Sequence, residues 1–296
     1  MLPKQGLIAV DWGTTNRRVF VFEQEGRVID RFADGAGVLS IRSEEFPSVI
    51  TMLRDRCGDR PMLLAGMIGS NRGWIEAPYV DCPTTIDGLA ARLVAVDGMP
   101  VHIVPGVCDR TMGRADVMRG EEVQLLGALA GGMIVQDMQS SLPGTHAKWA
   151  RLEQGAICGF KTVMTGEMFA LLRRHSLLAG PLTGEVEPGP AFEEGVRTAL
   201  ERRELLADLF AIRARTLLGT LAAEDVSSFC SGLLVGTDVA IGLDFVHGGA
   251  VALIGAPALT RLYASALALA GRQSQQIDGE AAFLAGIREI AARIYD

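Results

Sequence analysis

The segment Asp11-Trp12-Gly13-Thr14-Thr15 combines the residue types that a phosphate-binding turn requires. Gly13 lets the backbone approach a phosphate closely, and the N–H groups and hydroxyls of Thr14 and Thr15 can then face phosphate oxygens. Asp11 could hold Mg2+ through water, because magnesium prefers a carboxylate together with retained waters. Aspartate and glycine are also common in plain hairpin turns, and that alternative stays open.

A second glycine–threonine turn lies in Leu142–Trp149, which reads LPGTHAKW. The N–H groups of Gly144 and Thr145 would face a phosphate chain from its other side. Lys148 is one of only three lysines, and it could add a positive charge there or be an ordinary exposed strand residue. His146 could hydrogen-bond a phosphate or simply fix the turn.

The elements around the two turns follow the same order, a meander of short strands and then a helix. The first half is predicted to hold strands over 6–12, 18–23, 27–32, 61–67 and 101–105 and helices over 43–56, capped by Ser43, and 119–130. The second half is predicted to hold strands over 148–152, 156–161 and 251–254 and helices over 167–175, 191–221, 226–243, 256–269 and 279–295. This doubling predicts two α/β lobes.

Composition excludes several classes of partner. The chain has 296 residues, a net charge of −7 and no basic run, which disfavours a nucleic-acid partner. Pro257 and Arg261 interrupt the most apolar stretch, over 251–270, which disfavours a membrane span. The five cysteines are far apart, as expected for core thiols in a reducing cytoplasm.

The two turns and the doubled architecture resemble the actin-like ATPase superfamily of sugar kinases, heat-shock ATPases and actin. More specifically, the chain resembles the 2-dehydro-3-deoxygalactonokinase family. The matching segments are DWGTTNRR, GMIGSNRGWIEAPYVDCP, DVMRGEEVQLLGAL, LPGTHAKW, FKTVMTGEMFALL, SGLLVGTDV and VALIGAPALTRLY. The resemblance implies ATP-dependent, Mg2+-dependent phosphorylation of 2-dehydro-3-deoxy-D-galactonate at its terminal C6 hydroxyl, in galactonate catabolism.

A sugar kinase needs a carboxylate base to take the hydroxyl proton. At about 100° per residue, Glu122 points into the apolar stripe of the helix over 119–130, whereas Glu121 lies roughly 100° away. A carboxylate aimed at a packed face costs energy without a partner, which is typical of a functional site. A first-turn glutamate favoured by the helix dipole is the alternative, and Asp116 is the nearest rival base.

The glycine-rich loop over 66–83 offers polar groups for the sugar acid. Arg72 can bind a carboxylate bidentately, and Asn71 and Glu76 can bind hydroxyls. Trp74 offers a flat apolar wall. An ordinary loop with a surface arginine and a packed tryptophan is the alternative. The remaining candidates for acceptor or anion binding are Ser70 and Arg18.

Glycines at helix starts let an adenine ring and ribose approach the backbone. By resemblance, Gly232, Gly236, Gly255 and Ala256 form the adenosine pocket, although close helix packing would explain the first two equally well. No role follows from the sequence for three further residues, Lys161, Asp238 and Asp244.

These observations predict an α/β fold with two ribonuclease-H-like lobes around a cleft, over residues 1–135 and 136–296. The closing helix is expected to pack back on the first lobe. ATP·Mg would lie between the two turns, and the acceptor would lie near Arg72. A polyphosphate or guanosine-pentaphosphate hydrolase on the same fold and a non-catalytic sugar-responsive regulator are the alternatives. A homodimer and a cytoplasmic location are compatible with the sequence.

Overall fold

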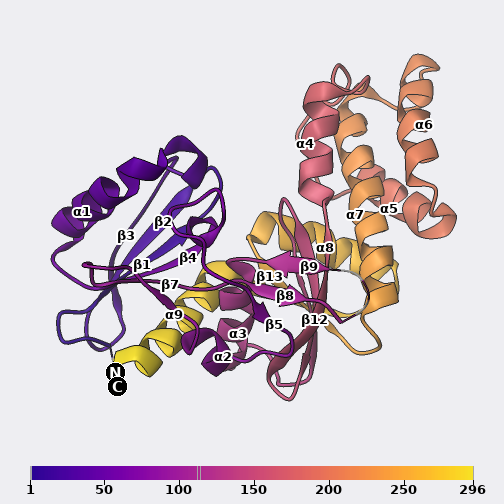
Figure 1. Ribbon diagram of the computed structural model, residues 1–296. Coiled ribbons are helices and arrows are strands. Elements are labelled where there is room, and N and C mark those ends of the chain that lie inside the picture. Colours follow the sequence, from indigo (N-terminus) through magenta and orange to yellow (C-terminus); the bar gives the residue numbers. More distant parts are fainter. Residues whose placement is uncertain (1, 112, 114, 296) are drawn as a thin grey trace. The chain divides into compact units, whose positions relative to one another are not determined.

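The computed structural model describes residues 2–111, 113 and 115–295 (Figure 1). The chain divides into two compact units. Unit 1 contains Met1–Gln136, Glu153–Gly159 and Glu280–Asp296, and unit 2 contains Asp137–Leu152 and Phe160–Gly279. Unit 1 is therefore assembled from three separate stretches of sequence.

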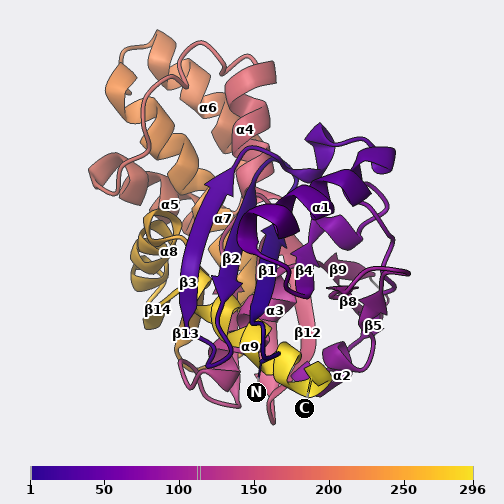
Figure 2. The same cartoon turned by 90° about the vertical axis from the view of Figure 1, so that its left-hand side faces the viewer.

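Unit 1 is built on a six-stranded sheet in the order β3-β2-β1-β4-β7-β6. Figure 2 shows its first four strands, from β3 to β4, side by side. Its strands are β1 (Leu7–Trp12), β2 (Arg17–Phe22), β3 (Val28–Asp34), β4 (Met62–Gly66), β6 (Val94–Ala95) and β7 (Val101–Ile103). The predicted meander is confirmed, because β1 and β3 both pair antiparallel with β2. This register places Asp11 directly opposite Arg18, while the parallel pairing with β4 places it beside Ala65.

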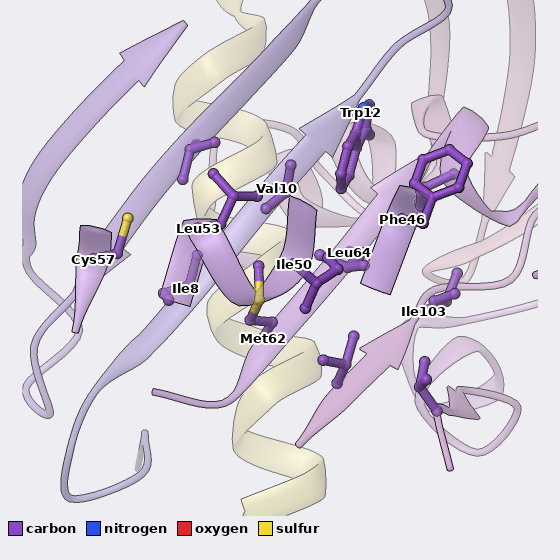
Figure 3. Packing of buried hydrophobic residues seen from close by; sticks show 14 of the residues in the cluster. Ile8, Val10, Trp12, Phe46, Ile50, Leu53, Cys57, Met62, Leu64 and Ile103 are labelled. Atoms are coloured by element: carbon purple, nitrogen blue, oxygen red, sulfur yellow. The ribbon is translucent and has the colours of Figure 1, made fainter. Parts of the chain in front are cut away.

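The two faces of this sheet bury different residues, because side chains alternate along a strand. Alternate residues of β1, from Ile8 to Trp12, pack with α1 (Phe46–Cys57) in one core cluster (Figure 3). The intervening residues Leu7 and Ala9 pack with α9 (Gly279–Tyr295) in another. The sheet is therefore covered by α1 on one face and by α9 on the other.

The helix α3 (Glu121–Ala130) packs closely on α9 through glycine. A Cβ atom at Gly127 would lie 2.1 Å from the carbonyl oxygen of Ala282, and one at Gly286 would lie 2.3 Å from that of Val123. Real Cβ atoms do not approach backbone this closely, so only glycine permits this helix spacing. The remaining elements of unit 1 are η1 (Val38–Ser40), η2 (Ser43–Glu45), η3 (Met67–Gly69), α2 (Ile86–Ala90) and a sheet of β5 (Val80–Asp81), β8 (Val107–Asp109) and β9 (Asp116–Met118).

The sheet of unit 2 repeats the order of the first, with β12-β11-β10-β13-β14. Its strands are β10 (Met138–Leu142), β11 (Ala147–Glu153), β12 (Ala156–Val163), β13 (Val251–Gly255) and β14 (Ser274–Asp278). The residues of β11 and β12 from Glu153 to Gly159 are grouped with unit 1. β10 pairs antiparallel with β11 and parallel with β13, as β1 pairs with β2 and β4. The first strand of each sheet therefore leads into a glycine–threonine turn.

Helices make up the rest of unit 2. They are α4 (Thr165–His175), α5 (Pro190–Arg202), α6 (Leu205–Leu217), η4 (Ala223–Asp225), α7 (Val226–Phe245) and α8 (Pro257–Leu269) (Figure 1). In the described residues, only the helical stretch Ala223–Phe245 is long and apolar enough to cross a membrane, and 83% of its apolar window is buried. Burial of this kind is typical of a core helix, and α7 packs with α5, α6 and α8.

One predicted helix begins later than expected, and several strands of the structure were not predicted. Ser43 opens the short turn η2, and α1 begins only at Phe46 with Pro47 in its first turn. The strand β10 was not predicted, because Ser140 and Ser141 give it a polar sequence although both are fully buried. The mostly exposed strand β14 was not predicted either, because the sequence SQQID lacks the apolar alternation of a half-buried strand.

Candidate active site

The first glycine–threonine turn leaves two amide groups for a ligand. Gly13 closes the hairpin by donating its N–H to the carbonyl of Asn16 at 2.9 Å. Thr14 and Thr15 are exposed, and their N–H groups and hydroxyls donate no hydrogen bond to the residues that the structure describes. These groups can therefore bind phosphate oxygens without breaking an existing contact.

The conformation of this turn depends on Gly37, which sequence reasoning missed. A Cβ atom there would lie 2.3 Å from the carbonyl carbon of Thr15 and 2.4 Å from the carbonyl oxygen of Thr14. Val38 donates its N–H to Gly13 at 3.0 Å, and Leu39 donates to Thr14 at 3.2 Å. The segment after β3 thus holds the turn by direct backbone contact. No local signal in the sequence points to a contact between positions this far apart.

Asp11, at the end of β1, lies in a cluster of charged groups. Its carboxylate forms an ion pair with Arg18, the residue opposite it in the sheet. Burial raises the pKa of Asp11, the charge of Arg18 lowers it, and the charge of Glu121 raises it further. The backbone permits this gathering through Gly66 and Gly120, because a Cβ at Gly120 would lie 3.3 Å from the Cα of Gly66. The ends of β1 and β4 and the start of α3 therefore meet here.

Glu122 is fully buried, as its place in the apolar stripe of α3 predicted. Its carboxylate oxygens accept hydrogen bonds from the N–H of Gly120 at 2.7 and 2.9 Å. Burial, reinforced by the charge of Glu121, raises the pKa of Glu122 to about 8. A carboxyl group with this pKa can take up and release a proton near neutral pH, which general acid–base catalysis requires.

The raised pKa predicts a pH dependence. If Glu122 must be ionised to accept a proton, kcat/KM is expected to rise about tenfold per pH unit below pH 8 and to level off above it. Initial rates at subsaturating acceptor between pH 6 and pH 9 measure this profile. A plateau that already begins at pH 6 would contradict a base with a raised pKa.

The other two candidate bases, Asp116 and Glu121, are less buried than Glu122. Asp116 lies on β9 opposite Asp109, and it accepts a hydrogen bond from the N–H of Val117 at 2.8 Å. Glu121 is half-buried and accepts from the N–H of Arg119 at 3.1 Å. Of the three candidate bases, only Glu122 is wholly removed from solvent.

The loop after β4 presents exposed and packed side chains. Asn71, Arg72 and Glu76 are exposed, and none of them forms a side-chain hydrogen bond or ion pair with another described residue. Trp74 instead stacks on Phe46, with ring centroids 6.2 Å apart, so it is partly a core residue as the alternative held. Ser70 donates its hydroxyl to the carbonyl of Met67 at 2.7 Å and thereby stabilises the backbone of the loop.

Arg119 is a further residue of this region that sequence reasoning missed. Its guanidinium is buried, donates to the carbonyl of Ala77 at 2.7 Å and lies 4.4 Å from the ring centroid of Tyr79. It thereby fixes the loop over 66–83 to the segment that leads into α3. The sequence shows that Arg119 precedes the predicted glutamates, but it does not show that the Arg119 guanidinium contacts the carbonyl of Ala77.

In unit 2, the second glycine–threonine turn is held by α4. The N–H of Glu167 donates to the carbonyl of Thr145 at 3.0 Å, and its carboxylate lies 2.6 Å from Nε2 of His146. The contact favours the interpretation that His146 fixes the turn. Lys148 is buried and donates to the carbonyl of His146 at 3.1 Å, so it is not an exposed strand residue.

A cavity of about 170 Å³ opens beside this turn. Its wall is mostly apolar, and it is formed by Gly144, Thr165, Gly166, Phe169, Val186, Ser231, Leu234, Val235, Leu259, Leu262 and Tyr263. A largely apolar pocket with a few polar groups suits a flat heterocycle. Gly144 of the second turn was predicted, and Leu234 and Val235 lie in the segment 232–237 that the resemblance assigned to the adenosine pocket. The other lining residues were not predicted, because they are spread over α4, α7, α8 and the loop before α5.

The four residues predicted for adenosine fall into two pairs. Gly232 and Gly236 pack against α5, where Cβ atoms would lie 2.1 Å from the carbonyl oxygen of Phe192 and 2.9 Å from Val196. Close helix packing therefore accounts for both, and they do not line the cavity. Gly255 lies near Pro143 of the second turn, and Ala256 precedes α8 as its N-cap residue.

Two residues without a predicted role make structural contacts. Lys161 lies over the ring of Phe245, 5.1 Å from its centroid, and Asp244 forms an ion pair with Arg203 at 2.8 Å. Within the described ranges, no group of three or more metal-ligating side chains could hold a metal ion.

The fold and the paired turns define the class of protein. Two sheets of the same strand order, each with a turn after its first strand, are typical of actin-like ATPases. A solved structure with this fold is the activator of the 2-hydroxyisocaproyl-CoA dehydratase from Clostridium difficile with bound ADPNP. It superposes with a TM-score of 0.54 at 8% identity, over 98% of this chain and 96% of its own. The expected fold class is thus confirmed.

Sequence comparisons identify the family. The family model for 2-keto-3-deoxy-galactonokinase matches residues 11–290. The 2-dehydro-3-deoxygalactonokinase of Escherichia coli (strain K12) is 38% identical over 96% of this chain and 97% of its own. The crystal structure of a protein from Sinorhizobium meliloti, described as a 2-dehydro-3-deoxygalactonokinase by provisional assignment, superposes with a TM-score of 0.91. That protein is 31% identical in sequence, and the match covers 98% of this chain and 99% of its own.

The chain belongs to the 2-keto-3-deoxy-galactonokinase family. It is a phosphotransferase with an alcohol group as acceptor, which agrees with the expected activity. The hydrolase and regulator alternatives are not favoured, because the match extends over nearly the whole chain.

Proposed function

We propose that this chain transfers the γ-phosphoryl group of ATP to the C6 hydroxyl of 2-dehydro-3-deoxy-D-galactonate, giving 2-dehydro-3-deoxy-6-phosphogalactonate. The observation that carries the proposal is Glu122, a buried carboxylate with a raised pKa at the start of α3. It lies in the unit that also holds Asp11 and the exposed amide groups of the first turn. A base, an anion-binding turn and a polar loop are the parts that phosphoryl transfer to an alcohol needs.

Different residues of unit 1 have the roles of base, phosphate ligand and acceptor ligand in this proposal. Glu122 accepts the proton of the attacking hydroxyl, and Thr14 and Thr15 donate hydrogen bonds to phosphate oxygens. Arg72 binds the acceptor's carboxylate, because its exposed guanidinium has no partner among the described residues. Asn71 and Glu76 bind acceptor hydroxyls, and Arg18, already paired with Asp11, adds positive charge near the turn.

The residues around Asp11 suit a magnesium ion that is held by one carboxylate together with phosphate and water, and not by a set of protein ligands alone. Mg2+ binds through one or two carboxylates together with substrate phosphates and water, and Asp11 provides one partly exposed carboxylate. The ion would neutralise charge on the phosphates during transfer. Asp11 would hold it, and Arg18 would orient the Asp11 carboxylate.

Asparagine in place of Asp11 is expected to raise the Mg2+ concentration for half-maximal activity about tenfold, because the amide loses the ligand's charge. Activity measured over a magnesium titration at fixed ATP gives this value. Asp34→Asn is the matched control, since Asp34 also pairs with an arginine, Arg17, at 2.6 Å. An unchanged magnesium response of the Asp11 variant would remove Asp11 from the metal site.

We assign the adenosine moiety to the cavity of unit 2. Gly144 belongs both to the second turn and to the cavity wall, which supports a nucleotide with its base in the cavity and its phosphates along the turn. Thr145, Lys148, Gly255 and Ala256 stay in this proposed site, and His146 orients the turn.

A coupled kinase assay tests the function directly. The purified chain is supplied with ATP, Mg2+ and a panel of 2-keto-3-deoxy sugar acids that differ at single stereocentres. We expect ADP formation that depends on the acceptor and is fastest with 2-dehydro-3-deoxy-D-galactonate. Phosphate release of equal rate without any sugar acid would instead indicate a hydrolase.

A cytoplasmic location is supported by the cysteines. All five are described, and all five are free thiols. Burial raises the pKa of Cys82 and Cys230 to about 12, so these thiols stay protonated and inert. Free buried thiols are typical of proteins in a reducing compartment.

A further inference from the structure

The helix α6 of unit 2 has one apolar face toward the core and a second apolar face toward solvent. Leu209 and Ile212 are buried and pack with residues of α7 in one core cluster. The other side carries Leu206, Leu218 and Leu217, which are 85%, 77% and 71% exposed and are the three most exposed large apolar residues that the structure describes. Figure 1 shows α6 at one edge of the helices of unit 2. Because a helix that is apolar on all sides is normally buried on all sides, we expect the exposed side of α6 to have a partner.

The exposed residues form a narrow stripe along α6. Leu206, Phe210, Arg213 and Leu217 follow one another at intervals of four, three and four residues, which is the spacing of a seam between two helices. At about 100° per residue, all four lie within about 60° of one another around the helix axis. We call these four residues the α6 stripe. An exposed apolar stripe of this kind is typical of an interaction surface.

Arg213 is the single charge of the α6 stripe, and it limits what can bind there. The two other charged residues of α6 already have partners, since Asp208 pairs with Arg202 at 3.2 Å and Arg215 pairs with Glu194 at 2.8 Å. A lipid bilayer fits the stripe badly, because the guanidinium lies between apolar neighbours and would enter the hydrocarbon with them, which is costly. The stripe instead fits a protein surface that is apolar at both ends and offers an aromatic ring in the middle.

We propose that the α6 stripe binds the α6 stripe of a second copy of this chain, with the two helices antiparallel about a two-fold axis. In this arrangement Leu206 faces Leu217 of the partner subunit, and Phe210 faces the partner's Arg213. One register satisfies both pairs, because each pair is centred on the same point of the helix, between Ala211 and Ile212. An interface between identical copies must be self-complementary in this way. The charge of each Arg213 then lies over an aromatic ring, which attracts it.

The size of the α6 stripe predicts a reversible dimer. A helix of 13 residues is about 20 Å long, and one such helix offers less area than the roughly 800 Å² per partner of a standard stable interface. We therefore expect a dissociation constant on the order of 10 μM, which is weak but measurable at ordinary protein concentrations.

Sedimentation of the full chain between about 1 and 100 μM tests the proposal. We expect the average mass to rise from that of one chain to that of two, and Leu206→Glu to weaken the dimer about tenfold or more. Leu177→Glu is the matched control, because Leu177 is a 54% exposed leucine of unit 2 outside α6. A wild-type chain that stays monomeric throughout would overturn the proposal, and so would equal dissociation constants for the two variants. Binding of such a monomer to phosphatidylcholine vesicles would assign the stripe to a lipid surface instead.

Cysteine cross-linking tests the register separately and does not depend on the charged variants. Leu206→Cys and Leu217→Cys, mixed under mild oxidation, are expected to form a disulfide-linked dimer. Neither variant is expected to cross-link alone, because identical positions of the two antiparallel helices lie about 16 Å apart along their axes. The wild-type chain under the same oxidation is the control for its own thiols, of which Cys158 is partly exposed. Efficient cross-linking of Leu206→Cys with itself would overturn the antiparallel arrangement.

Discussion

Replacement of Glu122 by glutamine is expected to lower kcat about a thousandfold and to leave ATP affinity unchanged. General base catalysis by a positioned side chain contributes about a hundredfold to ten-thousandfold, and glutamine cannot accept the hydroxyl proton. The amide has nearly the same shape, and its carbonyl oxygen can still accept the hydrogen bond from Gly120. Helix α3 therefore keeps its position while the base is lost.

Two measurements separate chemistry from binding. Turnover with saturating ATP and sugar acid gives kcat, and calorimetric titration with a non-hydrolysable ATP analogue gives nucleotide affinity. Glu121→Gln is the matched control, because Glu121 occupies the neighbouring position on α3 but is only half-buried. Near-normal turnover of the Glu122 variant would reassign the base, most simply to Asp116.

Alanine in place of Gly37 is expected to lower kcat/KM for ATP about a hundredfold. The added Cβ would overlap the backbone of Thr14 and Thr15, and backbone atoms cannot move aside by a change of rotamer. Either the turn or the segment after β3 must shift, and misplacing a binding group by about 1 Å can cost about a hundredfold in rate. Overpacking of this kind also costs typically about 1–3 kcal/mol of stability.

Gly35→Ala is the matched control for this prediction. Gly35 lies two residues earlier in the same connection, has no atom within 4 Å of the position that a Cβ would take, and has no left-handed backbone. Both variants are compared by thermal unfolding and by steady-state kinetics with ATP. Equal kinetics for the two would show that Gly37 does not hold the phosphate turn.

Periodic and short-range patterns predicted much of unit 1. The apolar run of β1 and the meander were predicted correctly, because each strand pairs with a neighbour close in sequence. The burial of Glu122 also followed from helical spacing alone, since a helix of ten residues has one apolar stripe. These features depend on local geometry, which the sequence carries directly.

Features that depend on distant contacts were not predicted. Gly37 is identifiable only from its contact with Thr14 and Thr15, and the fully buried Asp238 only from the hydrogen bonds that residues of β11, α4 and α8 donate to it. The glycines of α7 were ambiguous, because a helix contact and a ligand contact both select glycine. Arg119 was beside the predicted base, yet only the fold shows that its guanidinium contacts Ala77 in the loop over 66–83.

Because α9 is synthesised last and packs in unit 1, the two units differ in when they can fold during synthesis. Unit 2 is complete in sequence at Gly279, whereas unit 1 still lacks α9, which supplies Phe283 and Ile287 to its core. Domains tend to fold as their residues emerge from the ribosome, so unit 2 can fold before unit 1 has all of its residues. The helix that carries Glu122 gains its glycine contact with α9 only afterwards. A nascent chain therefore contains every segment of unit 2 before α9 is available to support the helix that carries the candidate base.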